Sequence, residues 1–127
     1  MRGDGAMSDF LQMYRRQKLF LTEILNMREY RHEHVALTKE YLLRLQVELS
    51  EVYNAAKLKE HVPVLNSTEK EHLLEELVDG FKFLLNILLV NGFTGEEIIR
   101  KFHEKSTNVE KRAKEEKWHE MRYPNPT

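Results

Sequence analysis

The sequence of 127 residues contains no cysteine, only three prolines and five glycines, and its positive and negative charges nearly cancel. Without cysteine there is no disulfide framework and no thiolate chemistry, which is compatible with a reducing cytoplasm. A formal net charge of -1 gives no sign of a surface dedicated to nucleic acid or to membranes. From these absences we expect a cytoplasmic protein that binds neither nucleic acid nor a membrane.

Long apolar runs are absent as well. The longest one, from Phe83 to Val90, contains Asn86 and is too short to span a bilayer. No apolar segment follows residues 1–7 that would make them part of a signal peptide, so we expect a disordered start or a cloning remnant there. The chain also has no Gly-rich phosphate loop, and a bound nucleotide would therefore be held through a metal ion and cationic side chains.

What the chain has instead is helical patterning over almost its whole length, without a segment that alternates like an exposed strand. We expect four helices, over residues 8–27, 34–60, 68–91 and 94–117. Residues 28–33 form either a charged connection or a continuation of the first helix. The pattern predicts an all-α bundle of four to five helices.

Local signals set these boundaries. Ser8 is a candidate N-cap, and Pro63 breaks the pattern. Thr68 and Thr94 are each followed three residues later by a glutamate, which is capping-box spacing, and Gly92 is a left-handed helix stop. We expect one domain over residues 8–118, followed by a tail over residues 119–127.

The third expected helix is apolar on nearly every side, because leucine, valine and phenylalanine recur around its whole circumference between residues 73 and 90. Three other amphipathic helices in so short a chain are too few to surround it completely. The sequence therefore predicts a homodimer or homotetramer, with this helix at or near the interface.

Two pairs of acidic residues stand three positions apart, Glu48 with Glu51 and Glu76 with Asp79, and no other acids in the chain have this spacing. Residues three apart share one face of a helix. Between Glu51 and Glu76 lie 24 residues, which lets two neighbouring helices run antiparallel and bring the pairs face to face.

On a wheel of roughly 100° per residue, Glu76 and Asp79 fall among apolar side chains, whereas the polar wedge lies at Glu75, Lys82 and Asn86. Converging carboxylates repel one another, and a hard divalent cation relieves that repulsion. The pattern predicts a Mg²⁺ site, with Mn²⁺ as a substitute; the alternative is ordinary solvated charge. The six histidines lack the spacing of zinc ligands.

In this order and spacing, the two pairs resemble the signature of the all-α nucleoside triphosphate pyrophosphohydrolases, which include the dimeric dUTPases, the MazG-like enzymes and phosphoribosyl-ATP pyrophosphohydrolase. The segment "ELSEVYN" is similar to Glu-Leu-Gly-Glu-Leu-Ala-Asn of the dimeric dUTPases, and "EELVDGFKF" is similar to their Glu-Glu-Tyr-Val-Asp-Gly-Leu-His-Phe. The resemblance implies Mg²⁺-dependent hydrolysis of a (deoxy)nucleoside triphosphate to the monophosphate and pyrophosphate.

The resemblance also implies roles for individual residues. The metal ligands would be Glu48, Glu51, Glu76 and Asp79, and Glu51 would in addition accept the proton of the attacking water. The residues that would contact the substrate lie in the first helix, after the first motif and near the C-terminus: Gln17, Asn54, Lys59, Lys105, Asn108, Lys111 and Arg112.

Two departures from the dimeric dUTPases concern the base. The tryptophan that follows their first motif is missing, and Leu21 stands where their first helix has an aspartate. We expect dUTP as substrate; the alternative is a MazG-like preference for dGTP, dCTP or many bases, in an apolar pocket that uses Phe20, Leu21 and Tyr53. An alternative of another class is a non-enzymatic helical interaction module, whose acidic pairs bind a basic partner.

Overall fold

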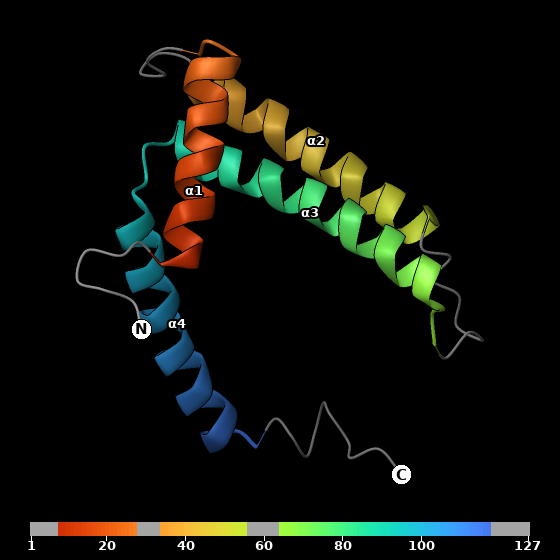
Figure 1. Ribbon diagram of the computed structural model, residues 1–127. Helices are drawn as coiled ribbons and strands as arrows, with labels where there is room; N and C mark the ends of the chain where they lie inside the picture. Colours follow the sequence, from red (N-terminus) through yellow and green to blue (C-terminus); the bar gives the residue numbers. More distant parts are fainter. Residues whose placement is uncertain (1–7, 28–33, 56–63, 118–127) are drawn as a thin grey trace. The chain divides into compact units, whose positions relative to one another are not determined.

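A computed structural model describes residues 8–27, 34–55 and 64–117 of the chain (Figure 1). Its elements, in chain order, are α1 (Asp9–Leu19), the π-helical turn η1 (Phe20–Ile24), α2 (His34–Ala55), α3 (Ser67–Val90) and α4 (Gly95–Glu115). The described residues contain no strand. The predicted all-α class is therefore confirmed.

The first helix begins as predicted but does not stay α-helical. The Ser8 hydroxyl accepts a hydrogen bond from the Leu11 N–H at 3.2 Å, which caps α1. After Leu19 the chain forms the wider turn η1, in which the Leu25 N–H donates to the Phe20 carbonyl at 2.9 Å. The prediction of one helix to residue 27 is wrong here, because apolar spacing does not reveal a single π-helical turn.

Helices α2 and α3 lie side by side along most of their length (Figure 1) and make the most extensive contact between helices of the fold. The two run antiparallel, as the interval between the acidic pairs predicts. Near the start of α2, the Thr38 hydroxyl accepts a hydrogen bond at 2.8 Å from Asn91, which follows the end of α3. The described part of α2 ends at Ala55, and the predicted last turn lies outside the described residues.

Helix α1 packs against the C-terminal half of α3. The Tyr14 hydroxyl donates to the Phe93 carbonyl at 2.7 Å, and the Gln17 amide donates to Asn86 at 2.8 Å. The core of α1, α2 and α3 consists of apolar and aromatic side chains from all three helices and from η1: Tyr14, Leu21, Tyr41, Val52, Leu85, Leu89 and Val90. This packing completes a small helical bundle within residues 8–93.

The start of α3 differs from the prediction. Its N-cap is Asn66, whose side chain accepts a hydrogen bond from the Glu69 N–H at 2.8 Å, while the Glu69 carboxylate accepts one from the Asn66 N–H at 3.0 Å. The capping box therefore lies two residues before Thr68, and the assignment of Thr68 as the cap is wrong. The end of α3 is as predicted, since Gly92 has a left-handed φ of 78°.

Helix α4 belongs to a second compact unit, which begins at Thr94. Its predicted capping box is present: the Glu97 N–H donates to the Thr94 hydroxyl at 3.1 Å, and the Thr94 N–H donates to the Glu97 carboxylate at 2.8 Å. An ion pair of 2.6 Å between Arg100 and Glu104 lies on its exposed surface.

The apolar surface of α3 is only partly covered. Its exposed large apolar side chains are Leu74, Leu77, Val78, Phe81 and Leu84, with exposed fractions between 39% and 55%. The described structure therefore leaves part of the apolar surface of α3 exposed. Among the described helices, none has both the length and the apolar character that a membrane span requires.

Candidate metal centre

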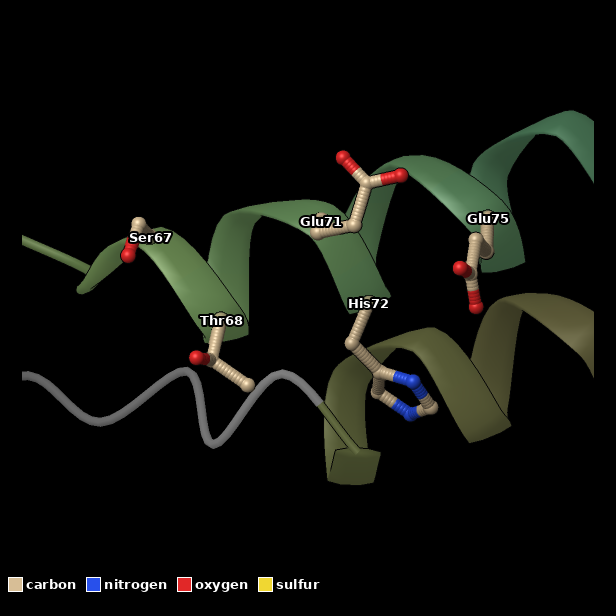
Figure 2. Close-up of a pocket in the computed structure, with 5 residues that line it drawn as sticks. All are labelled: Ser67, Thr68, Glu71, His72 and Glu75. Atoms are coloured by element: carbon tan, nitrogen blue, oxygen red, sulfur yellow. The ribbon is translucent and has the colours of Figure 1, made fainter.

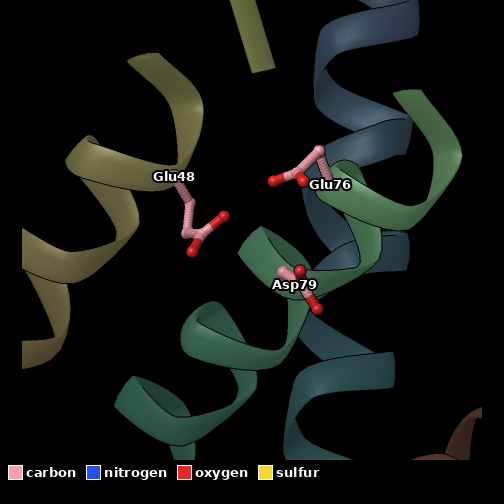
Figure 3. Close-up of side chains that lie close together, drawn as sticks. All are labelled: Glu48, Glu76 and Asp79. Carbon is pink, nitrogen blue, oxygen red and sulfur yellow. The ribbon is translucent and has the colours of Figure 1, made fainter. Parts of the chain in front are cut away.

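Three carboxylates from α2 and α3 converge at the middle of the helix pair. Glu48 reaches from α2 toward Glu76 and Asp79 on α3 (Figure 3). Each residue contributes one carboxylate oxygen to a group in which all the oxygens lie within 4.8 Å of one another. Glu48 and Glu76 are half-buried and Asp79 is exposed, so the group lies at an edge of the helix pair that solvent can reach.

The close approach of the two helices at this point involves a glycine. Gly80 follows Asp79 directly and is buried, and a Cβ placed on it would lie 3.5 Å from Leu45 Cδ1. Leu45 precedes Glu48 by three residues, so the contact between Leu45 and Gly80 lies about one turn from the acids of α2. A methyl group at position 80 would make an ordinary van der Waals contact with Leu45, whereas a larger side chain would meet Leu45 at this point between α2 and α3.

The surroundings of Glu48 raise the pKa of its carboxyl group. Burial raises the pKa of its carboxyl, and the negative charges of Glu51, Glu76 and Asp79 raise it further. Its Oε2 atom is buried and has no hydrogen-bond partner within the described part of the chain. A buried carboxylate oxygen without a partner destabilises the folded state. A cation or a proton bound at this atom would offset that destabilisation.

Glu51 lies one turn beyond Glu48 on α2 and is exposed. It is near enough for its charge to raise the pKa of Glu48, but it does not belong to the group of three converging oxygens. Of the four predicted metal ligands, the structure thus brings three together and leaves Glu51 beside them. Its role stays a prediction.

The donor set fits a hard divalent cation. All three side chains offer oxygen, which Mg²⁺ prefers, and three carboxylates leave coordination positions for water or for substrate oxygens. One of these three residues, Glu48, also has the buried oxygen without a hydrogen-bond partner among the described residues. Among the described residues, no histidine belongs to this group.

A contact that the sequence analysis missed links this site to the start of α3. The Nε2 atom of His72 lies 3.9 Å from Oε1 of Glu76, one helical turn away. His72 also lines a shallow surface depression of about 400 Å³ together with Ser67, Thr68, Glu71 and Glu75 (Figure 2). The i,i+4 spacing of His72 and Glu76 is the signal that would have found the contact.

The predicted substrate-binding residues are distributed over several parts of the chain. Gln17 is half-buried on α1, and Asn54 is exposed near the end of α2. Lys59 lies outside the described residues. Exposed positions on α4 hold the remaining four, which are Lys105, Asn108, Lys111 and Arg112. Their predicted contact with the substrate stays a prediction.

Two residues near the expected base pocket are placed differently from the prediction. Asn86 was assigned to the polar wedge with Glu75 and Lys82; those two are exposed, but Asn86 is only 6% exposed. Leu21 is fully buried, so it is a core residue and offers no surface to a ligand. Phe20 and Tyr53, with exposed fractions of 39% and 63%, remain accessible.

Comparison with known protein families identifies a relationship that fits this geometry. A family model described as dUTPase matches residues 9–117, which include the helices that carry the three carboxylates. The chain belongs to the dUTPase family. Membership in the dUTPase family confirms the resemblance to the all-α pyrophosphohydrolases and indicates nucleoside triphosphate hydrolysis in general. Comparisons with curated proteins and with solved structures gave no match.

Proposed function

We propose that this member of the dUTPase family is a Mg²⁺-dependent pyrophosphohydrolase that converts a deoxynucleoside triphosphate to the monophosphate and pyrophosphate. The observation that carries the proposal is the convergence of Glu48, Glu76 and Asp79 within 4.8 Å, with a buried and unpartnered oxygen on Glu48. Such a group is suited to a cation that also contacts phosphate oxygens.

In the proposed reaction, the oxygen of a water molecule attacks the α-phosphorus and the bond from that phosphorus to the oxygen bridging to the β-phosphorus breaks. Glu48, Glu76 and Asp79 would hold the cation, which would neutralise phosphate charge and lower the pKa of a water molecule bound to it. Glu51 lies beside these ligands without joining them, and we assign it the role of accepting the proton of the attacking water. Pyrophosphate leaves with the bridging oxygen.

The charge of the phosphates requires cationic and hydrogen-bonding partners as well. We assign this role to Lys105, Lys111 and Arg112, with Asn108 as a neighbouring hydrogen-bonding group. Asn54 and Lys59, which follow the first acidic pair, complete the proposed contacts with the nucleotide. The four C-terminal residues lie on exposed positions of α4.

For the base we propose dUTP as the preferred substrate, on the strength of the family. Gln17 is present and half-buried on α1, where its amide donates a hydrogen bond to Asn86 of α3. Leu21 is a core residue and does not substitute for a polar contact with uracil. Because lost polar contacts weaken discrimination between bases, the proposal allows a broader selectivity than a dedicated uracil site would have.

The test is product analysis with purified protein, Mg²⁺ and a panel of dNTPs and NTPs that includes dUTP. The expected products are dUMP and pyrophosphate, with turnover abolished by chelator and restored by Mg²⁺ or Mn²⁺. Release of orthophosphate and a nucleoside diphosphate would overturn the mechanism. A preference for a purine nucleotide would retain the mechanism and replace dUTP as the substrate.

The same protein tests the alternative of a non-enzymatic interaction module. Binding of a cation to the folded state raises the melting temperature, because the unfolded chain lacks the converged carboxylates. We expect saturating Mg²⁺ to stabilise the protein measurably. A melting temperature that does not respond to Mg²⁺ or Mn²⁺, together with absent turnover, would favour the interaction module.

We further propose that the functional form is a homodimer or homotetramer. The support is the exposed apolar surface of the helix pair, to which α2 contributes Leu42, Leu43, Val47 and Leu49, and α3 contributes Leu74, Leu77, Val78, Phe81 and Leu84. A second copy of the chain is a partner that can bury such a surface.

A further inference from the structure

A buried amide pair joins α1 to α3. Asn86 is the only polar side chain in the described part of the chain that is buried, with 6% of its surface exposed. Its Oδ1 atom accepts a hydrogen bond of 2.8 Å from Nε2 of Gln17. A side-chain amide in apolar surroundings is costly unless it is hydrogen-bonded, so this bond fixes the orientation of both side chains.

The pair lies on the same side of α3 as the carboxylates. Asn86 follows Asp79 by seven residues, which returns the side-chain direction to within about 20° and advances roughly 10.5 Å along the helix axis. Phe83 lies between them on the same side, half-buried, with its ring 6.2 Å from that of Tyr41. A ligand held at the carboxylates and extended along this side of α3 therefore meets the amide pair beyond an aromatic ring.

Gln17 is the member of the pair that a ligand can reach. It is half-buried, whereas Asn86 is covered. The hydrogen bond to Asn86 uses one N–H of the Gln17 amide and leaves its oxygen and its other N–H for further bonds. Without Asn86, the Gln17 side chain would distribute over several rotamers, and a ligand would have to order it on binding.

We propose that Asn86 is a positioning residue for the base: it holds the Gln17 amide in one orientation, so that this amide presents an acceptor and a donor to a nucleobase edge that carries both a donor and an acceptor. This inference rests on the proposed function, because it assumes that the triphosphate lies at Glu48, Glu76 and Asp79. It adds a selectivity determinant that makes no contact with the substrate.

The test replaces Asn86 by leucine, which has a similar volume and cannot hydrogen-bond. The KM for the best substrate of the panel rises by up to about tenfold in Asn86→Leu, the cost of ordering one flexible side chain on binding, while kcat changes little because the carboxylates are untouched. Gln17→Leu has the same effect, and the double variant loses no more than Gln17→Leu alone, because Asn86 acts through Gln17. Asn91→Leu, which removes an exposed amide from the same end of α3, leaves KM unchanged.

Two results would overturn the inference. One is an effect of Asn86→Leu on KM that is undiminished in the Gln17→Leu background. The other is a lowered melting temperature with an unchanged KM, which would mean that the amide pair only stabilises the packing of α1 on α3.

A binding experiment separates this inference from the proposed function. The dissociation constants of the α,β-imido analogues of dUTP and of the four common dNTPs are measured by calorimetry with Mg²⁺, which requires no turnover. If the wild type binds an analogue but releases no pyrophosphate from any nucleotide, the proposed function is wrong, and the weakened binding in Asn86→Leu still tests the amide pair. If the wild type binds no analogue, both proposals are overturned.

Discussion

Glu48 is the residue whose ionisation the fold opposes, and this makes the stability of the metal-free protein depend on pH. Burial, followed by the charges of Glu51, Glu76 and Asp79, raises its pKa above the ordinary value of 4.5. The folded state therefore binds this proton more tightly than the unfolded chain does. The contribution of Glu48 to the free energy of unfolding therefore falls as pH rises from 4.5 through the raised pKa. Above the raised pKa it stays at its lowest value.

We expect this effect in urea unfolding of chelator-treated protein between pH 4 and pH 8. Glu48→Gln is more stable than the wild type above the raised pKa, because glutamine does not ionise. The difference in stability disappears as the pH falls toward 4.5, the ordinary pKa of a glutamate. Glu75→Gln, which removes an exposed carboxylate of α3, follows the wild-type curve. A difference between Glu48→Gln and the wild type that does not change with pH would contradict the assignment of the effect to ionisation.

We expect Asp79 to act as a metal ligand and Glu51 to act as the proton acceptor. Asp79→Asn loses both turnover and the stabilisation by Mg²⁺, because it removes a charge from the converged group. Glu51→Gln keeps most of the stabilisation by Mg²⁺ but loses turnover by about 100-fold or more, the usual effect of removing a general base. Turnover and melting temperature in Mg²⁺ are measured for both variants, with Glu75→Gln as the unaffected control. Loss of the Mg²⁺ response in Glu51→Gln would make Glu51 a ligand.

The position of a residue can be predicted from the sequence where it depends on residue spacing within one helix or between neighbouring helices. The spacing of Glu76 and Asp79 within one helix, and of Glu48 on the antiparallel neighbour, predicts their convergence. Asn86 was not predictable in this way, because its burial depends on Gln17, which is 69 residues away on another helix. The periodicity of α3 places Asn86 beside the polar positions Glu75 and Lys82 and within about 20° of Asp79, and only the packing of α1 shows that Asn86 is covered.

At the scale of helices, the spacing between α2 and α3 is the property on which the metal centre depends. Gly80→Ala should be tolerated, since its Cβ would make an ordinary contact of 3.5 Å with Leu45, and it should stabilise α3 by about 0.5–1 kcal/mol through the higher helix propensity of alanine. Gly80→Leu introduces a side chain for which this contact leaves no room. It should separate the helices and abolish the stabilisation by Mg²⁺.

Thermal unfolding with and without Mg²⁺ measures both effects of the Gly80 variants. The matched control is Glu75→Ala, which changes an exposed polar position of α3 outside the apolar surface. If Gly80→Leu responds to Mg²⁺ as the wild type does, the close approach of the helices at Gly80 is not required for the site.

The starts of α3 and α4 show when a capping box in the sequence is enough to predict the first residue of a helix. Thr94 with Glu97 predicts the start of α4 correctly, because no rival cap lies nearby. Before α3, both Asn66 with Glu69 and Thr68 with Glu71 have capping-box spacing, and the structure uses the earlier pair. Asparagine is a slightly better N-cap than threonine, and choosing it adds two residues to the helix.

For the whole molecule, the exposed apolar surface of α2 and α3 predicts self-association. We expect light scattering to give at least twice the chain mass of 15.2 kDa at micromolar concentration. Leu84→Glu places a charge on this surface, where burial against a second copy would desolvate it, and should shift the protein toward the monomer. Lys82→Glu, which changes the charge of an exposed polar position on the same helix, should not.

Circular dichroism of Leu84→Glu distinguishes dissociation from misfolding, because a folded monomer retains the helical spectrum. A wild type that is monomeric at micromolar concentration would exclude this interface. A wild type and a Leu84→Glu variant that are both dimeric would place the interface on another part of the chain.

The π-helical turn η1 determines where this chain tolerates a change in length. A π-helical turn accommodates one residue more than the same stretch of α-helix, and the bond from the Leu25 N–H to the Phe20 carbonyl marks the position of the extra residue. Deleting one residue between Phe20 and Leu25 can restore an unbroken α-helix without turning Gln17 away from α3. The same deletion between Leu45 and Glu48 would rotate Glu48 by about 100° relative to Leu45 and remove it from the carboxylate group. When relatives of different length are aligned, single-residue gaps therefore belong in η1 and not in α2.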